Sequence, residues 1–204
     1  MKLIVGLGNP EDKYNGTRHN LGFDLLDHYV TDKLSVSESN KFWSFNKDFK
    51  SLIGEISCQL PAADDKLLLI KPQTYMNSSG LAVAAVAKYY QINPEDIIVL
   101  HDDLDITVGK LKIRLGGAAA GHHGVESIID CLKTDKFIRV RLGIGTEKSL
   151  LSEKEGNGFV AEKFVLNKFD SDEKSKIKHI TKQITDILDL ILEKGLESAQ
   201  NQFN

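Results

Sequence analysis

Short apolar segments alternate along this chain with longer segments whose apolar residues recur at helical spacing. The short segments are rich in β-branched residues, as in "LIVG" near the start and "DIIVLHD" at 96–102, and are typical of buried strands. The longer segments, such as Asn20–Leu34, have the spacing of helices that bury one face. This alternation predicts an α/β fold with a mixed, mostly parallel central sheet flanked by helices.

The predicted elements follow one another without an internal repeat or an interdomain linker. Strands are predicted at Lys2–Leu7, 51–58, 66–70, 96–102, Val108–Leu115 and Ile138–Ile144. Helices are predicted at Asn20–Leu34, Ser78–Gln91, 124–133 and, as one long amphipathic C-terminal helix, from Ser171 to Leu196. The polar segment 149–158 is expected to be a mobile loop. With 204 residues, the chain suffices for one domain spanning 1–204.

The composition excludes several classes of protein. No apolar run approaches the roughly 20 residues that span a bilayer. The apolar N-terminal stretch is too short for a signal peptide, and Gly8-Asn9-Pro10 interrupts it. Cys58 and Cys131 form no close-spaced pair, so neither a disulfide framework nor a zinc ribbon is indicated. We therefore expect a cytoplasmic protein without a membrane segment.

The charge is unevenly distributed along the chain. The net charge is −3, which argues against a generic basic coat for nucleic acid. Between Lys110 and Arg141, however, seven Lys or Arg stand against three acids, so this segment is +4 and the remainder is −7. Such segregation is compatible with a local anion-binding face, although helix and strand surfaces often carry similar runs of charge.

The two glycine-rich stretches do not match the common nucleotide-binding motifs. Gly6-Leu7-Gly8 follows a predicted strand, but Glu11 stands where a dinucleotide-binding motif has its third glycine. The second stretch, "LGGAAAGHHG", lacks the Gly-Lys-Ser/Thr of a P-loop. A Gly-x-Ser-x-Gly elbow for a serine nucleophile is also missing from the sequence.

Two groups of residues are candidate metal ligands. His122 and His123 are adjacent, so their side chains point apart in any regular structure and do not converge on one ion. The "HDDLD" stretch offers His101, Asp102, Asp103 and Asp105 at the end of a predicted buried strand. A metal-dependent phosphoesterase thus remains an alternative, although an acidic strand end is more often a cap or a solvated turn.

Polar clusters follow three of the predicted strands. In open α/β sheets, ligand sites collect beyond the carboxyl ends of strands. The clusters supply Asn9, Tyr14 and His19 after the first strand, Asp102 after another, and Met76 with Asn77 in "TYMNSSG". A histidine and an aspartate at one rim suit a general base and the carboxylate that orients it. Taken singly, each residue is more often structural, since Asn9 is also a turn former and Asn77 a helix cap.

Together these stretches resemble the bacterial-type peptidyl-tRNA hydrolase family over nearly the whole chain. The matching segments, in order, are "LIVGLGNPEDKYNGTRHNLGF", "KPQTYMNSSGLAV", "IIVLHDDLD", "GKLKIRLGG…GHHG" and "RVRLGIG". The resemblance implies a monomeric enzyme, without metal, cofactor or obligate protein partner. It would cleave the ester that joins a peptide to the 3′-terminal adenosine of tRNA, and so recycle tRNA from aborted translation.

The resemblance also implies roles for individual residues. His19 would be the general base that activates water, and Asp102 would hold and support its imidazole. Asn9 would recognise the first amide of the peptide, and Asn77 would position the substrate and stabilise charge. The residues expected to contact substrate or tRNA are Tyr14, Tyr75, Met76, Arg114, His122, His123 and Arg141.

The glycine-rich stretch departs from the family's pattern. The family usually reads Gly-Gly-His-Gly-Gly-His-Asn-Gly where this chain has 117–124, "GAAAGHHG". The usual first histidine becomes alanine, and the substrate-contacting asparagine becomes His123. Asp103 likewise replaces the usual glutamate of the acidic motif. Since the four catalytic residues are present, we expect an active enzyme with an altered tRNA-contacting loop; a catalytically inactive tRNA-binding protein is the other alternative.

Overall fold

One seven-stranded sheet organises the computed structural model, which describes residues 1–57, 66–146, 149 and 160–204. The strand order is β2-β3-β4-β1-β5-β7-β6. The four central strands are parallel, namely β4 (Lys66–Pro72), β1 (Lys2–Gly6), β5 (Ile97–Thr107) and β7 (Ile138–Gly145). The antiparallel edge strands are β2 (Ser44–Asn46), β3 (Ser51–Ser57) and β6 (Leu111–Leu115). The predicted α/β class is confirmed.

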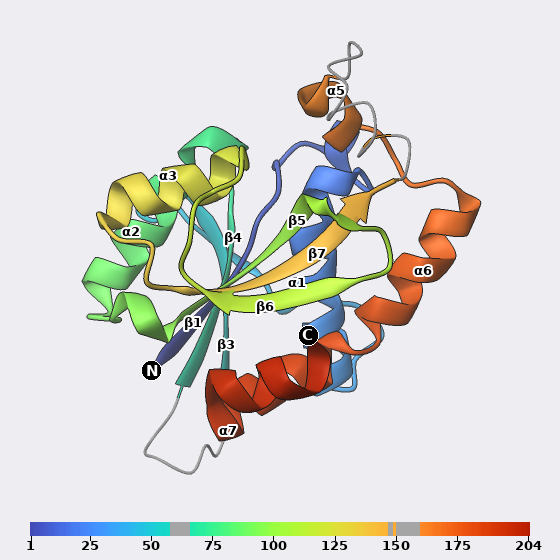
Figure 1. The fold of residues 1–204 in the computed structure, drawn as a ribbon. Coiled ribbons are helices and arrows are strands. Elements are labelled where there is room, and N and C mark those ends of the chain that lie inside the picture. Colours follow the sequence, from blue (N-terminus) through green and yellow to red (C-terminus); the bar gives the residue numbers. More distant parts are fainter. Residues whose placement is uncertain (58–65, 147–148, 150–159) are drawn as a thin grey trace.

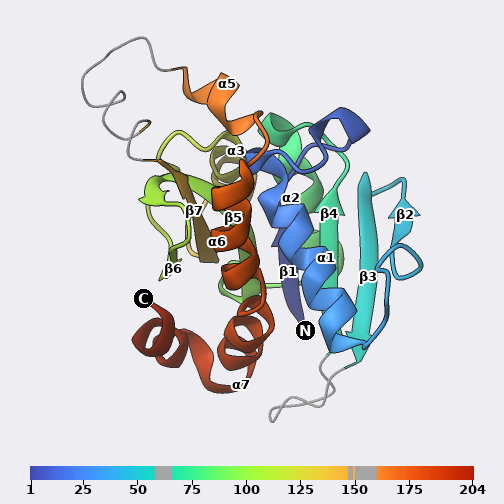
Figure 2. The same ribbon diagram turned by 90° about the vertical axis from the view of Figure 1, so that its right-hand side faces the viewer.

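Helices cover both faces of the sheet (Figures 1 and 2). One face carries α2 (Ser79–Tyr89) and α3 (His123–Leu132). The other face carries α1 (Leu21–Lys33), α6 (Ser171–Thr181) and α7 (Ile184–Phe203). A short helix, α5 (Ala161–Val165), lies near the start of α1. None of the helices in the described part of the chain is long and apolar enough to cross a membrane.

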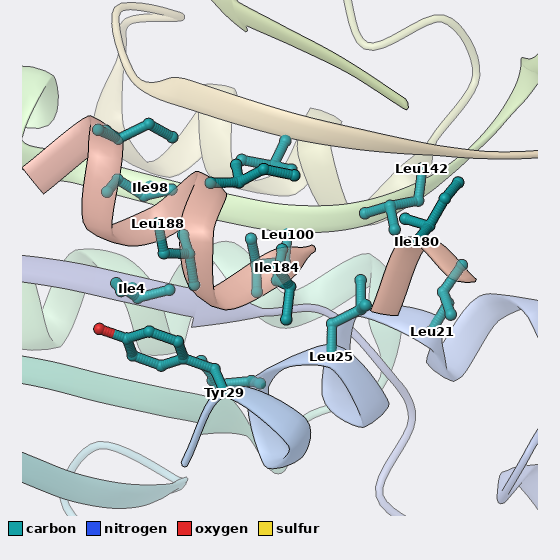
Figure 3. Close-up of a cluster of buried hydrophobic side chains, with 14 of the residues drawn as sticks. Ile4, Leu21, Leu25, Tyr29, Ile98, Leu100, Leu142, Ile180, Ile184 and Leu188 are labelled. Carbon is teal, nitrogen blue, oxygen red and sulfur yellow. The ribbon is translucent and has the colours of Figure 1, made fainter. Parts of the chain in front are cut away.

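Alternation along each strand divides the core into two layers. Ile98 and Leu100 of β5 pack toward α1 and α7, whereas Val99 packs toward α2 and α3. Figure 3 shows the first layer, where Leu25 of α1 and Ile184 of α7 meet the strand residues. Each fully buried side chain of this size contributes about 1.5–3 kcal/mol. Continuing the alternation, Asp102 follows Ile98 and Leu100 on the α1 face of β5.

Gly22 allows α1 to begin very close to the centre of the sheet. A Cβ atom at this position would lie 2.4 Å from the carbonyl oxygen of Leu100 and 2.6 Å from the amide nitrogen of Leu7. Any side chain would therefore push the start of α1 away from β1 and β5. This close approach sets the residues that precede α1 directly over the carboxyl end of β5.

A long C-terminal helix is present as predicted, but its bounds differ from the prediction. The single helix expected from Ser171 to Leu196 is instead α6 and α7, with a turn at 182–183, and α7 itself bends at Gly195 (φ 82°). The bend brings the end of the chain to β6, where the Asn204 amide pairs with both the N–H and the C=O of Ile113. The apolar spacing carries on through the breaks, because both helices pack on the same face of the sheet.

The bounds of other strands also differ from the predicted ones. β5 runs on to Thr107, and β6 begins only at Leu111, because the chain turns at Gly109 (φ 90°). Neither the short edge strand β2 nor helix α5 was predicted from the sequence. The end of the strand expected at 51–58, and the loop expected at 149–158 apart from Ser149, lie outside the described residues.

Candidate active site

His19 and Asp102 form a buried pair at the carboxyl edge of the sheet. His19 lies in the 3₁₀ turn Arg18–Asn20, immediately before α1. Its Nδ1 lies 3.0 and 3.1 Å from the two carboxylate oxygens of Asp102, and both side chains are buried. With Nδ1 donating to the carboxylate, the lone pair of Nε2 is left to accept a proton. The pair predicted from the two motifs is therefore within hydrogen-bonding distance.

A second histidine, His122, also binds Asp102. Its Nε2 lies 3.0 Å from Asp102 Oδ1, and its Nδ1 accepts hydrogen bonds from the N–H groups of Gly124 and Val125 at 3.1 and 3.3 Å. His122 is thus the N-cap of α3. Because Nδ1 is an acceptor, a neutral imidazole must carry its proton on Nε2 and donate it to Asp102. Asp102 accepts hydrogen bonds from both imidazoles, and we call the three residues the Asp102 network.

The Asp102 network shifts two pKa values in opposite directions. Burial by itself would raise the pKa of the Asp102 carboxyl, but attraction to His19 and His122 and their hydrogen bonds lower it well below its usual range. Burial would lower the pKa of His19, but the Asp102 carboxylate outweighs it and raises that pKa above 6.5. At neutral pH, Asp102 is therefore an anion that stabilises the protonated form of His19.

The Asp102 network resembles a metal site in its composition. The ligand atoms of His19, Asp102 and His122 all lie within 4.8 Å of one another, the only such group of three among the described residues. However, the lone pair of His122 Nδ1 is used by the backbone of α3, so Nε2 carries a proton and has no lone pair for an ion. The hydrogen bonds therefore favour proton transfer over metal binding here.

The metal ligands proposed for a phosphoesterase do not converge. His101 is fully buried, and its Nδ1 bonds the backbone oxygen of Asp102. Asp103 forms an ion pair with Arg141 at 2.7 Å, whereas Asp102 faces the opposite side of β5 and binds the histidines. Asp105 is exposed. Among the described residues, these four therefore do not bring three ligand atoms close enough together to hold one ion.

Arg18 holds the His19 turn against the C-terminal part of the chain. Its Nη2 donates to both oxygens of Glu173 at 2.8 and 2.6 Å, and its Nη1 donates to the carbonyl of Lys168. The guanidinium also lies over the ring of Phe164 at 4.3 Å. Both partners of the ion pair are buried. Sequence reasoning missed Arg18, although it stands beside His19 in "TRHN".

Asn9 is fixed by two neighbouring loops. The Asn20 side chain pairs with the backbone N–H and C=O of Asn9, each at 2.9 Å. The side-chain oxygen of Asn9 accepts the backbone N–H of Met76 at 2.9 Å. This bond orients the Asn9 amide, whose NH₂ group is its donor toward a carbonyl oxygen of a substrate.

The segment that follows β4 contains both buried and exposed residues. Met76 is buried, and its sulfur lies where a side chain at Gly124 would be, 2.5 Å from an added Cβ atom. Asn77 is exposed, as is Tyr75, whose hydroxyl donates to Glu11. Tyr14 is half-buried. The structure thus brings Asn9 and Met76 together and leaves Asn77 and Tyr75 at the surface beside them.

Four cations share one face of the β6–β7 pair. Lys112 is opposite Arg141 and Arg114 is opposite Arg139, so their side chains project from the same side of the sheet. We call these four residues the basic ladder. Lys112 is exposed and Arg114 half-buried, whereas Arg141 is tied to Asp103. Four of the seven cations of the +4 segment thus share one face of these two strands.

Arg139 is the buried member of the basic ladder and supports the glycine-rich loop. Its two NH₂ groups donate to the carbonyls of Gly116 and Ala118 at 2.5 and 2.9 Å. Burial, together with Arg114 and Arg141, lowers the pKa of Arg139 to about 10, so it remains charged at neutral pH. Within the loop, Ala120 has φ 49°, a left-handed conformation that alanine adopts less readily than glycine.

A cleft of about 270 Å³ opens beside His19 and Asp102. Its walls come from the end of β5, the 120–123 loop and α5. His123 stands at this cleft, exposed, with its ring nitrogens 3.4 Å from Glu126 and 4.0 Å from Glu162. The adjacent histidines do point apart, His122 inward to Asp102 and His123 outward.

The α/β sheet carries a buried histidine–aspartate pair and a cleft at its carboxyl edge, an arrangement typical of enzymes that use a histidine base. The family model described as "Peptidyl-tRNA hydrolase" matches residues 3–204. Peptidyl-tRNA hydrolases of Trichodesmium erythraeum (strain IMS101) and Clostridium acetobutylicum are 39% and 38% identical to the whole chain, which covers 88% and 98% of their lengths.

Solved structures agree with these relatives. A crystal structure of peptidyl-tRNA hydrolase in complex with n-propanol is 31% identical, with a TM-score of 0.81. The enzyme from Acinetobacter baumannii is 30% identical, with a TM-score of 0.78. Each match covers 99% of this chain and 93% of the solved chain. The chain belongs to the peptidyl-tRNA hydrolase family.

Proposed function

We propose that this enzyme hydrolyses the ester between the peptide and the 3′-terminal adenosine of peptidyl-tRNA, with His19 as the general base. The observation that carries the proposal is the hydrogen bond from His19 Nδ1 to Asp102, which leaves Nε2 as the acceptor beside the cleft. Family membership supplies the substrate class. The reaction recycles tRNA from aborted translation.

The proposed reaction needs one base and one water molecule. Nε2 of His19 removes a proton from water as the oxygen attacks the ester carbonyl carbon, giving a tetrahedral intermediate. The intermediate then expels the ribose 3′ oxygen, which takes the proton back from the His19 imidazolium. Asp102 stabilises that imidazolium, and a base of this kind contributes typically about 10²–10⁴-fold in rate. An ester has a good leaving group, so neither a covalent nucleophile nor a metal ion is required.

Two asparagines are proposed to bind and position the acyl group. The oxygen of the Asn9 amide is bound to the Met76 N–H, and the NH₂ group would donate to the carbonyl oxygen of the first peptide bond. Asn77 is exposed beside it and would position the substrate and stabilise the developing oxyanion. Met76 supports both from below.

The tRNA is proposed to lie along the basic ladder and the loop that leads from it to His122. Arg114 and Arg141 would bind the 5′-phosphate of the acceptor stem, and arginine can do so with two hydrogen bonds. Tyr14 and Tyr75 would shape the surface that receives the 3′ end. His122 and His123 belong to the same rim, although the hydrogen bond of His122 to Asp102 favours a positioning role for it.

We further propose that residues 1–204 act as one domain, as a cytoplasmic monomer without a membrane attachment or an obligate protein partner. The support is the single sheet and the location of the substrate, which is a product of translation. Sedimentation at micromolar concentration tests the oligomeric state, and a concentration-dependent dimer would contradict it.

Release of free tRNA from an N-blocked aminoacyl-tRNA tests the function. The wild-type protein is expected to release it, and His19→Ala is expected to lower kcat by about 10²–10⁴-fold. The matched control is the same tRNA with an unblocked amino group, which lacks the amide that Asn9 would bind. Undiminished release by His19→Ala would overturn the assignment of the base, and no release by the wild type would overturn the function.

A further inference from the structure

The cleft beside His19 has apolar walls and an acidic rim. Leu104 of β5 and Val165 of α5 line it, together with Ala120 of the loop. Four carboxylates also line it, and no Lys or Arg does among the described residues. The composition of this cleft is thus opposite to that of the basic ladder, so a phosphate group fits the cleft poorly.

Two of the four carboxylates are already neutralised. Asp102 is held by the two imidazoles, and Asp103 forms its ion pair with Arg141. Asp105 and Glu162 are exposed, and neither forms an ion pair with a Lys or Arg in the described part of the chain. These two carboxylates line the cleft from different elements, β5 and α5.

The remaining titratable group at the rim is His123. Its nitrogens face Glu126 on its own helix and Glu162 on α5. When protonated, His123 would therefore be shared between two carboxylates, and when neutral it leaves both charges uncompensated. In either state the rim keeps a net negative charge.

We propose that this cleft receives the side chain of the amino acid esterified to the tRNA and favours a cationic side chain over an acidic one, through Asp105 and Glu162. The inference rests on the hydrolase function proposed above. A lysine or arginine side chain matches the cleft in both of its parts, because its methylene stem lies along apolar walls while its charge reaches the rim. An acidic side chain would add a like charge between two carboxylates.

The test uses one tRNA body esterified in turn with lysine, norleucine or glutamate. Each amino acid is acetylated on its α-amino group only, so that the lysine side chain keeps its charge. Norleucine has a similar straight aliphatic stem without the charge. For the wild type we expect kcat/KM to fall in the order lysine, norleucine, glutamate, with the two ends about tenfold apart, since each exposed carboxylate is worth up to a few-fold. High salt should shrink this ratio because the rim is solvated.

The variants Asp105→Asn and Glu162→Gln each should reduce the lysine-to-glutamate ratio, and the double variant should bring it to within about twofold of unity. Glu95→Gln is the matched control, since Glu95 lies in the turn before β5, at the opposite edge of the sheet. It removes the same charge and should keep the wild-type ratio. Thermal melts verify that all variants fold.

Equal rates for the three esters in the wild type, or a ratio unchanged in the double variant, would overturn the charge preference alone. A wild-type protein that leaves all three esters intact would overturn the hydrolase function, and the preference with it. The norleucine ester has no side-chain charge, so its hydrolysis tests the hydrolase function separately from the charge preference.

Discussion

The Asp102 network lies at the end of β5 and the basic ladder on the neighbouring strands β7 and β6, yet the two groups differ in burial. Asp102, His19 and His122 are buried and joined by hydrogen bonds of about 3 Å. In the basic ladder, Arg139 is buried, but Lys112 is exposed and Arg114 half-buried. Water and salt screen charges at the surface much more than charges in the interior. In the function that we propose, the buried Asp102 network is preorganised for the chemical step, whereas the exposed cations of the basic ladder supply affinity that many different tRNAs can use.

Replacing Asp102 by asparagine should have the largest effect on rate. The amide cannot stabilise the His19 imidazolium, so kcat is expected to fall by about 10²–10⁴-fold, with KM for tRNA little changed. Single-turnover and steady-state assays on blocked aminoacyl-tRNA measure both. A loss confined to KM would mean that the Asp102 network binds tRNA, and the contrast between the two regions would disappear.

Removing Arg18 should have the largest effect on stability. Arg18→Met leaves Glu173 buried without its partner, which is expected to cost about 3–5 kcal/mol of unfolding free energy. The half-buried pair Lys2–Asp96, which is much more solvated, is the control, because Lys2→Met should cost only about 0–1 kcal/mol. Urea denaturation measures both variants. Similar costs for the two would show that burial does not set the strength of the Arg18 ion pair.

The pH dependence of kcat/KM should report the His19–Asp102 pair. His19 acts as a base only when neutral and its pKa is raised, so activity should decline as pH falls through a value above 6.5. In Asp102→Asn only the lowering effect of burial on the pKa of His19 remains, so the residual activity should extend to lower pH. The lowered pKa of Asp102 also affects the free energy of unfolding. It stabilises the folded protein above about pH 4, and this stabilisation is lost as pH falls further. An acid limb that is unmoved in Asp102→Asn would contradict the pairing.

Arg114→Ala should weaken tRNA binding without a matching loss of kcat. Removing one phosphate contact is expected to lower the slope of log KM against log salt by about one. Lys194→Ala, on α7 across the sheet, is the control and should keep the wild-type slope. Titration of KM between low and moderate salt measures the difference. An unchanged slope in Arg114→Ala would remove the basic ladder from the tRNA site.

His123→Asn should have the smallest effect. Histidine gains charge as pH falls toward about 6, whereas asparagine does not. We expect KM for tRNA to rise between about pH 5.5 and 7.5 more steeply in the wild type than in the variant, and the two profiles to differ by less than about fivefold, as for an exposed ion pair. Superimposable profiles would contradict a role for this charge.

The fold was predictable to the level of its class and of its central elements. The central strands and the main helices were predicted correctly because the spacing of apolar residues and the turn residues are local signals in the sequence. The breaks in the C-terminal helix at 182–183 and at Gly195 were not found, since the apolar spacing continues through them. Strand β2 and helix α5 are too short for their periodicity to be recognised.

The candidate site was predictable in its residues but less so in its contacts. The motifs named His19, Asp102, Asn9 and Met76, which the structure brings to one edge of the sheet. They did not reveal that His122 binds Asp102, that Arg18 binds Glu173, or that Arg139 holds the glycine-rich loop. Each of these side chains could have been read as a surface charge or an RNA contact.

The sequence by itself determined which segments become strands and helices, because periodicity, turn residues and side-chain volume act over a few residues. Only the tertiary structure decided which polar groups meet. His19 and Asp102 are separated by 83 residues, and Arg18 and Glu173 by 155. Such contacts depend on strand order, on the close approach that Gly22 permits and on which face of β5 Asp102 occupies. Those features exist only once the sheet has assembled and its interior has excluded water.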